Sequence, residues 1–120
     1  MPDRNAMIEA VKTHCRGQTE GDLEAWLPIW ADDVVIEDPV GAAIYRGIEE
    51  VRTTFWPQGR NANVRLWLEA DVIVCGNEAM AICAAEVGPE GERRRLGPIV
   101  DHFTFDEAGK ITRMRAFFNY

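Results

Sequence analysis

The sequence is short of basic residues, and those it has form no cluster. It holds 20 aspartates and glutamates against 13 lysines and arginines, a net charge of -7, with both signs intermixed along the chain. Nucleic acids and anionic membranes are recognised by basic stripes or patches. We therefore expect neither a nucleic acid nor a membrane as a partner.

Long apolar runs are also absent, and the first residues do not have the pattern of a signal peptide. No apolar stretch approaches the roughly 20 residues that span a bilayer. The N-terminal residues Met1-Pro2-Asp3-Arg4-Asn5 lack the charged-then-apolar order of a signal peptide. The expected location is the cytoplasm.

Cysteine and histidine are scarce. The three cysteines, Cys15, Cys75 and Cys83, include no CxxC pair, which is typical of free, unreactive thiols in a reducing compartment. The two histidines, His14 and His102, do not have the spacing of a metal motif. We expect no metal site.

The chain does have enough apolar material for one core. Its 120 residues are 47% hydrophobic and 28% charged, an ordinary globular balance. Repeats, low-complexity tracts and linkers are missing, so residues 1–120 are expected to form a single domain.

Helical spacing of apolar residues dominates the first half of the chain, and strand patterns dominate the second. Pro28 should kink or shorten the second helix, and Pro57 with Gly59 should end the third. We expect three helices, over residues 4–20, 22–30 and 48–56. We expect strands over residues 34–38, 64–74, 79–87, 93–105 and 110–118. This order predicts an α+β domain in which a strongly curved, mostly antiparallel sheet folds over the helices and leaves a conical apolar pocket.

Asp38 stands at the end of the first predicted strand, among Val35, Ile36, Pro39 and Val40. Desolvation raises the pKa of a carboxyl group held beside apolar residues, which is what a general base working near neutral pH requires. The alternative is that Asp38-Pro39 is simply a turn that ends the strand.

Asp101 is a second carboxylate in apolar surroundings. In the strand pattern it shares one face with Ile99, Phe103 and Phe105, so this face is expected to be the inner one. An isolated buried carboxylate is too costly, so Asp101 should be paired or protonated. A protonated Asp101 can donate a hydrogen bond. In the alternative, it satisfies a backbone group or pairs with an arginine from another strand.

Three blocks of sequence carry a family resemblance. They are Gly21–Glu24 leading into Ala31–Gly41, Pro98–Phe103, and Gly109–Ile111 with Met114–Ala116. Together with the element order, which agrees over essentially the whole chain, they resemble the ketosteroid isomerases (steroid Δ5-isomerases) of the nuclear transport factor 2-like (NTF2-like), or SnoaL-like, superfamily. The resemblance implies a cone-shaped fold, a homodimer, and proton transfer without a metal or organic cofactor.

The resemblance also implies roles for individual residues. Asp38 matches the catalytic base, and Asp101 matches the protonated aspartate that hydrogen-bonds the developing enolate oxygen. The family's second donor is a tyrosine on the first helix, and this sequence has His14 at that position and no tyrosine within residues 1–29. A neutral imidazole donates one N–H but is a weaker acid than a phenol. Loss of one good oxyanion donor typically lowers the rate about 10²–10³-fold.

His14 therefore leaves two interpretations open. It is either a substitute donor or a structural helix residue bonded to a neighbour. As a donor it implies a slower steroid isomerase or a different carbonyl substrate.

Apolar side chains are expected to line the pocket, although each could instead be core packing. They are Val40, Phe55, Trp56, Phe103, Met114, Ala116 and Phe118. His102, Arg113 and Arg115 alternate with inner residues, so they should face solvent or a second subunit.

The sequence thus predicts an isomerase that moves the C=C bond of a 3-oxo-Δ5-steroid into conjugation through a dienolate. One alternative is another SnoaL-like enzyme, a polyketide cyclase or a hydrolase. An epoxide hydrolase of this fold would need an Asp–Arg–Asp relay on inward positions, and no inward arginine is evident. The other alternative is a non-catalytic binder of apolar small molecules.

Overall fold

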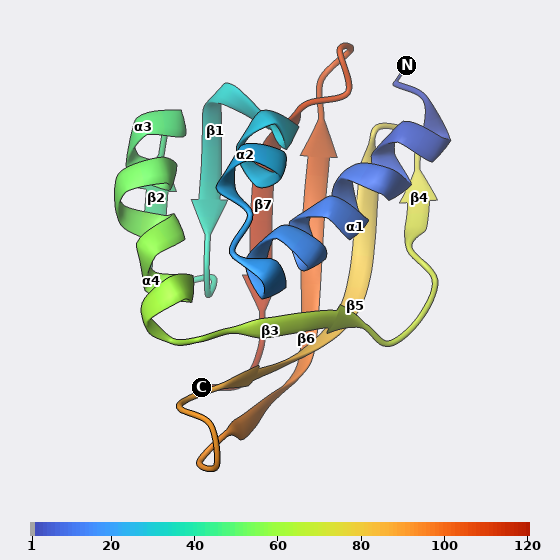
Figure 1. The fold of residues 1–120 in the computed structure, drawn as a ribbon. Coiled ribbons are helices and arrows are strands. Elements are labelled where there is room, and N and C mark those ends of the chain that lie inside the picture. The colour runs from blue at the N-terminus through green and yellow to red at the C-terminus, as the bar shows by residue number, and fades with distance from the viewer. Residues whose placement is uncertain (1) are drawn as a thin grey trace.

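The computed structural model describes residues 2–120, with all helices on one face of a single curved sheet (Figure 1). The helical segments are α1 (Arg4–Glu20), α2 (Leu23–Trp26) with a 3-10 turn at Leu27–Ile29, and α3 (Ile48–Glu50), which a π-helical turn (Val51–Phe55) joins to α4 (Trp56–Asn61). The strands are β1 (Trp30–Glu37), β2 (Ile44–Arg46), β3 (Arg65–Leu68), β4 (Ile73–Cys75), β5 (Glu78–Val87), β6 (Arg94–Phe105) and β7 (Ile111–Phe117).

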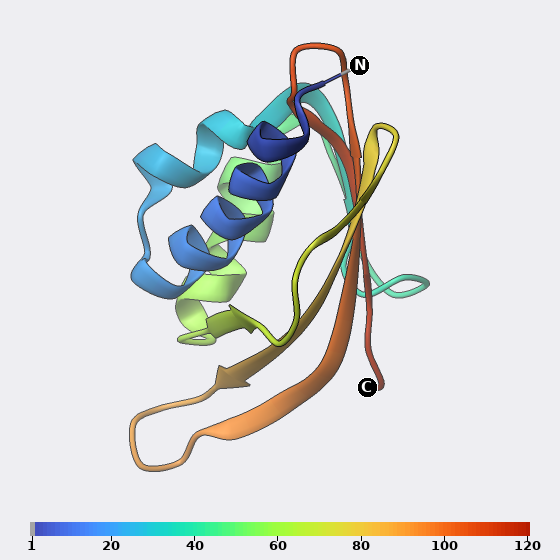
Figure 2. The same ribbon diagram turned by 90° about the vertical axis from the view of Figure 1, so that its right-hand side faces the viewer.

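The sheet has the order β2-β1-β7-β6-β5-β3, and β4 also pairs with β5. The β1–β7 pair is parallel, and the other pairs are antiparallel. In the edge-on view, β5 and β6 bend at their lower ends toward the helices, so the sheet is concave on the helical side (Figure 2). The predicted α+β architecture is confirmed.

Helix α1 lies across the concave face and presents one side of itself to the core. The Asp3 side chain accepts a hydrogen bond from the Ala6 N–H at 2.9 Å and caps the N-terminus. Gly21, at φ 71°, ends the helix in the left-handed conformation that glycine adopts without strain. The buried side of the helix includes His14 and Gln18, one turn apart. These polar side chains therefore lie between α1 and the concave face of the sheet.

The third predicted helix is longer than expected. It was expected to end before Pro57, but the helical segment continues to Asn61. Pro57 sits in the first turn of α4, directly after the π-helical turn. A proline is tolerated in a first turn, where its missing N–H is not needed. The prediction that Pro57 ends the helix was wrong for this reason.

Other boundaries also differ from the prediction. The single strand expected over residues 64–74 is divided into β3 and β4, because the chain leaves β5 between Glu69 and Val72, where two acidic residues interrupt the apolar pattern. The second helix ends at Trp26, before a 3-10 turn that contains Pro28, so the early end expected at Pro28 is confirmed. Trp30, which was expected to end that helix, instead begins β1, four residues before the predicted start of the strand at Val34. The short strand β2 was not predicted.

The alternation of inner and outer residues along β6 is confirmed. Ile99, Asp101, Phe103 and Phe105 are buried, and the residues between them are half-buried. On the outer face, Arg113 and Arg115 both bond to Glu37, and the His102 imidazole lies 2.6 Å from a Glu78 carboxylate oxygen. The same face exposes Met80, Ile82 and Phe117. The homodimer stays a prediction.

The remaining expectations concern cysteines and membrane spans. All three cysteines are free; Cys15 and Cys83 are buried, and Cys75 is exposed. Within residues 2–120, none of the helices combines the length and the apolar character needed to cross a membrane.

Candidate active site

A cavity of about 220 Å³ lies between α1, the end of α4 and the concave face of the sheet. His14, Asp38 and Asp101 all contribute to its wall. Most of the remaining wall is apolar, from residues such as Leu66, Ala85, Leu96 and Ile99. The exposed residues Gln58 and Ala62 mark its open end. The structure thus brings the three predicted catalytic residues into one pocket.

Asp38 reaches the cavity from the loop that follows β1. Its backbone N–H donates to the Ala43 carbonyl at 3.0 Å, and the Val40 N–H donates to the Ala116 carbonyl on β7 at 2.9 Å. These bonds fix the loop, which contains a cis Asp38–Pro39 peptide, to the edge of the pocket. Burial raises the pKa of Asp38 to about 6. At neutral pH the carboxyl group is therefore mostly ionised yet basic enough to accept a proton.

Asp101 projects into the cavity from the middle of β6. Its neighbours across the sheet are Ala81 on β5 and Ala116 on β7, two small residues that leave space around the carboxyl group. The residue is 3% exposed. Burial, and then the charge of Asp38, raise the pKa of Asp101 well above its ordinary value. Both effects favour the protonated carboxylic acid.

No cationic side chain of the described chain compensates Asp101. The nearest titratable nitrogen is His14 Nε2, 3.9 Å from Asp101 Oδ2, which is too long for a hydrogen bond. An arginine partner for Asp101, one of the alternatives that its strand pattern left open, is absent within residues 2–120. Asp101 is thus available to donate to a ligand.

His14 stands beside Asp101 on the buried side of α1. Burial lowers the pKa of His14 to about 4, so the imidazole is neutral at pH 7. Its Nδ1 accepts a hydrogen bond from the indole Nε1–H of Trp26 at 3.0 Å. A neutral imidazole carries one proton, so that proton lies on Nε2, the nitrogen nearest Asp101. His14 can therefore bond to a neighbour through Nδ1 and donate into the pocket through Nε2 at the same time.

Of the seven predicted pocket residues, three line this cavity. They are Phe55, Ala116 and Phe118. Val40 instead lines a separate hollow beside Pro98 and Phe117.

The other three predicted pocket residues belong to the core. The Trp56 ring packs on Trp26 with centroids 4.6 Å apart, and the Phe103 ring lies 5.8 Å from the His14 ring. Met114 is 1% exposed and does not reach the cavity. Strand alternation predicts which residues point inward, but it does not distinguish a residue that packs in the core from one that lines a cavity.

Two glutamines of the wall were missed. Gln18 follows His14 by four residues on α1, so helical spacing alone places the two on one face. Gln58, near the open end, accepts a hydrogen bond from the Tyr45 hydroxyl at 2.8 Å. No sequence signal marks Gln58, because α4 extends further than the sequence predicted.

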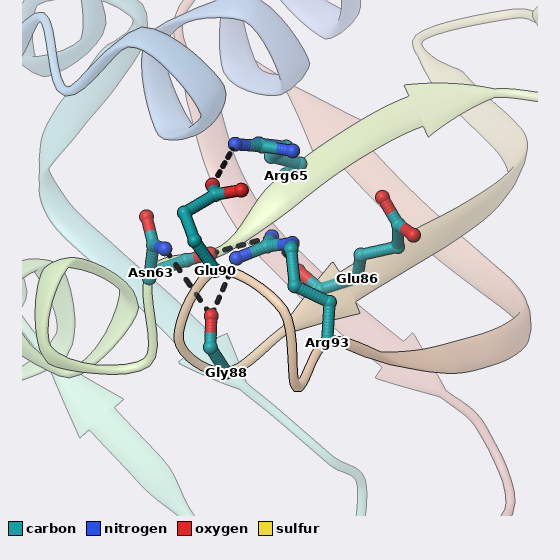
Figure 3. Close-up of polar contacts among 6 residues, drawn as sticks. All are labelled: Asn63, Arg65, Glu86, Gly88, Glu90 and Arg93. Carbon is teal, nitrogen blue, oxygen red and sulfur yellow. Dashed lines mark hydrogen bonds and ion pairs between the residues drawn. The ribbon is translucent and has the colours of Figure 1, made fainter.

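A polar clamp holds the segment after α4 against the β5–β6 hairpin (Figure 3). The Arg93 guanidinium donates to the carbonyls of Asn63 at 2.8 Å, Glu86 at 3.0 Å and Gly88 at 2.5 Å. Arg65 on β3 forms an ion pair with Glu90 of the hairpin. Because Ala62 and Val64 line the cavity on either side of Asn63, this clamp fixes the wall near the opening.

Comparison with known proteins identifies the family. Residues 11–114 match the SnoaL-like domain. A steroid Delta-isomerase of Nocardioides simplex is 32% identical over 108 residues, covering 90% of this chain and 85% of that protein.

Solved structures give the same result. The epoxide hydrolase/cyclase-like enzyme SalBIII, which has a role in pyran ring formation in the polyether salinomycin, has a TM-score of 0.86 at 28% identity, over 99% of this chain and 95% of its own. An LEH-like epoxide hydrolase of M. tuberculosis has a TM-score of 0.85, over 99% of this chain and 82% of its own, but at 19% identity it supports the fold alone. This chain belongs to the SnoaL-like family of NTF2-like proteins.

Proposed function

We propose that this chain is a ketosteroid-isomerase-type enzyme that moves a C=C bond into conjugation with a ketone by intramolecular proton transfer. One observation carries the proposal. One apolar cavity holds both the half-buried carboxylate of Asp38, whose pKa is raised to about 6, and the buried carboxyl group of Asp101, which has no cationic partner among the described residues. Pairs of carboxyl groups with different environments can divide the roles of base and hydrogen-bond donor.

The reaction begins when Asp38 takes a proton from the carbon between the ketone and the double bond. The electron pair of that C–H bond forms a new C=C bond to the carbonyl carbon, and the π electrons of the C=O bond move onto the ketone oxygen, which gives a dienolate. Asp101 and His14 Nε2–H donate hydrogen bonds to this oxygen as its charge grows. Asp38 then returns the same proton two carbons further on, so the product is an isomer and the enzyme is unchanged.

The positions of the two donors support this arrangement. With 3.9 Å between Asp101 Oδ2 and His14 Nε2, one acceptor oxygen can lie about 2.8 Å from both, which is ordinary hydrogen-bond length. Neither group is in hydrogen-bond contact with the other, so both are free for that oxygen.

The volume of the cavity bears on the substrate. At about 220 Å³ it is smaller than the roughly 300–1,000 Å³ of most small-molecule sites. We infer that the reacting ring enters the cavity and the rest of a steroid projects past Gln58 and Phe118, or that the substrate is a smaller apolar ketone. In either case the wall favours an apolar ligand with one carbonyl group.

The likeness to SalBIII favours a second candidate, ring closure of a hydroxy-epoxide. In that reaction Asp38 would take the proton of the attacking hydroxyl, and Asp101 would give its proton to the epoxide oxygen. Hydrolysis of an epoxide by an Asp–Arg–Asp relay has less support, because none of the described residues that line the cavity is an arginine.

Turnover of a Δ5-3-ketosteroid by the native protein and by Asp38→Asn tests the proposal. We expect conversion to the conjugated ketone, and a fall of about 10²–10⁴-fold in kcat for the variant, since general-base catalysis contributes that much. Glu37→Gln is the matched control, because it neutralises the adjacent carboxylate on the outer face, and it should retain kcat within about threefold. Absence of turnover, or equal loss in both variants, would contradict the proposal. Turnover of a hydroxy-epoxide instead would favour the cyclase.

A further inference from the structure

We propose that Trp26 is a positioning residue that holds His14 in the one tautomer able to donate a hydrogen bond to the substrate oxygen. The inference rests on the proposed function for its catalytic consequence. Its structural part, the selection of a tautomer by an indole, can be tested without any substrate.

The chemistry of the two rings defines the tautomer. An indole N–H can only donate, so the 3.0 Å contact from Trp26 Nε1 requires His14 Nδ1 to be unprotonated. The neutral ring then carries its proton on Nε2, which faces Asp101. Trp26 is fully buried, so water does not compete for Nδ1.

The other tautomer would remove both donors from the substrate. With the proton on Nδ1, Nε2 becomes an acceptor 3.9 Å from the Asp101 carboxyl group. A movement of about 1 Å would bring the two within hydrogen-bond distance. The carboxylic acid would then donate to His14, and neither group would be left to bind a developing enolate. Trp26 thus keeps Asp101 and His14 as two separate hydrogen-bond donors to the same substrate oxygen.

The packing around Trp26 is built to hold the indole in this place. Gly17 lies on α1 three residues after His14, and a Cβ there would come within 2.8 Å of Trp26 Cβ and 2.9 Å of its Cδ1. A glycine is therefore required for α2 to approach α1 this closely. The rings of Trp56, at 4.6 Å, and Trp30, at 5.1 Å, enclose the indole on other sides.

Trp30 provides a matched control within the same cluster. It is 3% exposed, and its ring lies 5.5 Å from the His14 ring in an edge-on arrangement. In contrast to Trp26, its indole nitrogen has no hydrogen-bond partner among the described residues. Trp26→Phe and Trp30→Phe therefore remove similar volumes beside His14, but only the first removes a hydrogen bond to the imidazole.

The experiment is ¹⁵N NMR of the histidine ring nitrogens at neutral pH in the substrate-free protein, with His14 assigned through His14→Gln. We expect protonated Nε2 and unprotonated Nδ1 in the native protein and in Trp30→Phe. In Trp26→Phe we expect the proton to move wholly or partly to Nδ1. A second variant, with Trp26 replaced by 3-benzothienylalanine, keeps the two-ring shape and removes only the N–H, so it should give the same change with the core still filled.

Kinetics supply the catalytic part. At metal sites, losing the outer partner that orients an imidazole costs roughly 10–100-fold, and we expect kcat of Trp26→Phe to fall by about tenfold or more on that scale, with KM within about threefold. Trp30→Phe should remain within about threefold of the native kcat. Retention of Nε2–H in both Trp26 variants would overturn the inference. Failure of the isomerase assay alone would leave the NMR result standing, and would count against the proposed function instead.

Discussion

Glu37 and Asp38 are adjacent carboxylates with opposite surroundings. Glu37 ends β1 on the outer face of the sheet, where Arg113 bonds to it at 2.7 Å and Arg115 at 3.1 Å. The hydrogen bond from Arg113 and the nearby charge of Arg115 hold the pKa of Glu37 below its ordinary value. Asp38 turns into the cavity, has no such partner among residues 2–120, and has a pKa raised by burial to about 6. One step along the chain thus separates a structural anion from a candidate base.

The difference follows from the two faces of the sheet. The outer face can hold arginines, because their charge stays in contact with water while they pair with Glu37. The cavity on the concave face offers Asp38 and Asp101 apolar side chains, two uncharged glutamines, a neutral imidazole and each other, but no cation. Buried carboxyl groups without cations have raised pKa values, which is a frequent property of acid–base sites. Glu37 on the outer face stabilises the fold. Asp38 and Asp101 on the concave face lower its stability, and their raised pKa values suit them to acid–base chemistry.

After the loss of the base Asp38, the largest expected effect comes from removing the inner donor, Asp101. Asp101→Ala should lower kcat for the Δ5-3-ketosteroid by about 10²–10³-fold, the usual loss for one oxyanion donor. Asp101→Asn keeps an N–H donor at the same place and should lose less. Steady-state kinetics measure both.

A phenolic steroid, which mimics the enolate, gives an independent control on Asp101. It should bind Asp101→Ala more weakly than the native protein, as measured by calorimetry. Unchanged binding together with unchanged kcat would show that Asp101 only fills the interior.

The second effect concerns stability, and its sign is unusual for an aspartate. The pKa of Asp38 rises from 3.8 to about 6 on folding, so folding takes up protons and stability falls as pH rises through this window. A rise in the pKa from 3.8 to about 6 corresponds to at most about 3 kcal/mol of lost stability above pH 6. Asp38→Asn, which cannot ionise, should therefore be more stable than the native protein near pH 7.5, by about 1–3 kcal/mol.

Urea denaturation near pH 7.5 and near pH 3.5 checks this prediction. The advantage of Asp38→Asn should shrink almost to zero at the acidic pH, where both forms of residue 38 are uncharged. A variant less stable than the native protein at pH 7.5 would contradict burial as the cause of the raised pKa.

The third effect is the pH dependence of turnover. Because Asp38 must be ionised to accept a proton, kcat/KM should fall about tenfold per pH unit below a midpoint near 6 and be level above it. Glu37→Gln should leave that midpoint in place, since Glu37 does not face the cavity. A midpoint near the ordinary value for aspartate would mean that Asp38 is more hydrated than the fold indicates.

The sequence is a good guide to this contrast, but not to the environment of His14. Strand alternation places Asp101 inward and Arg113 outward, because the period of a strand is fixed by its backbone. The bond from Trp26 to His14 joins residues 12 positions apart on different helices, so it depends on how closely α2 packs on α1. Local patterns carry no signal for that distance, except the small residue at Gly17. The same limit explains why Trp56 and Phe103 were predicted to line the pocket, although both pack in the core.

The smallest expected effect comes from the outer carboxylate, and it should have the opposite sign to Asp38→Asn. The pKa of Glu37 is lowered in the folded protein, so its contribution to stability is complete above the unfolded-state pKa and is lost as pH falls. Glu37→Gln should therefore lower Tm modestly at pH 7, and the difference should narrow toward acidic pH. It should also narrow in high salt, since the side chains of Arg113 and Arg115 are 51% and 30% exposed and salt screens ion pairs that are open to solvent. Thermal denaturation of both variants at matched pH and salt measures this. We expect Glu37→Gln to lower Tm and Asp38→Asn to raise it. A shift of Tm in the same direction for both variants would contradict the contrast between Glu37, which pairs with arginines, and Asp38, which faces the cavity.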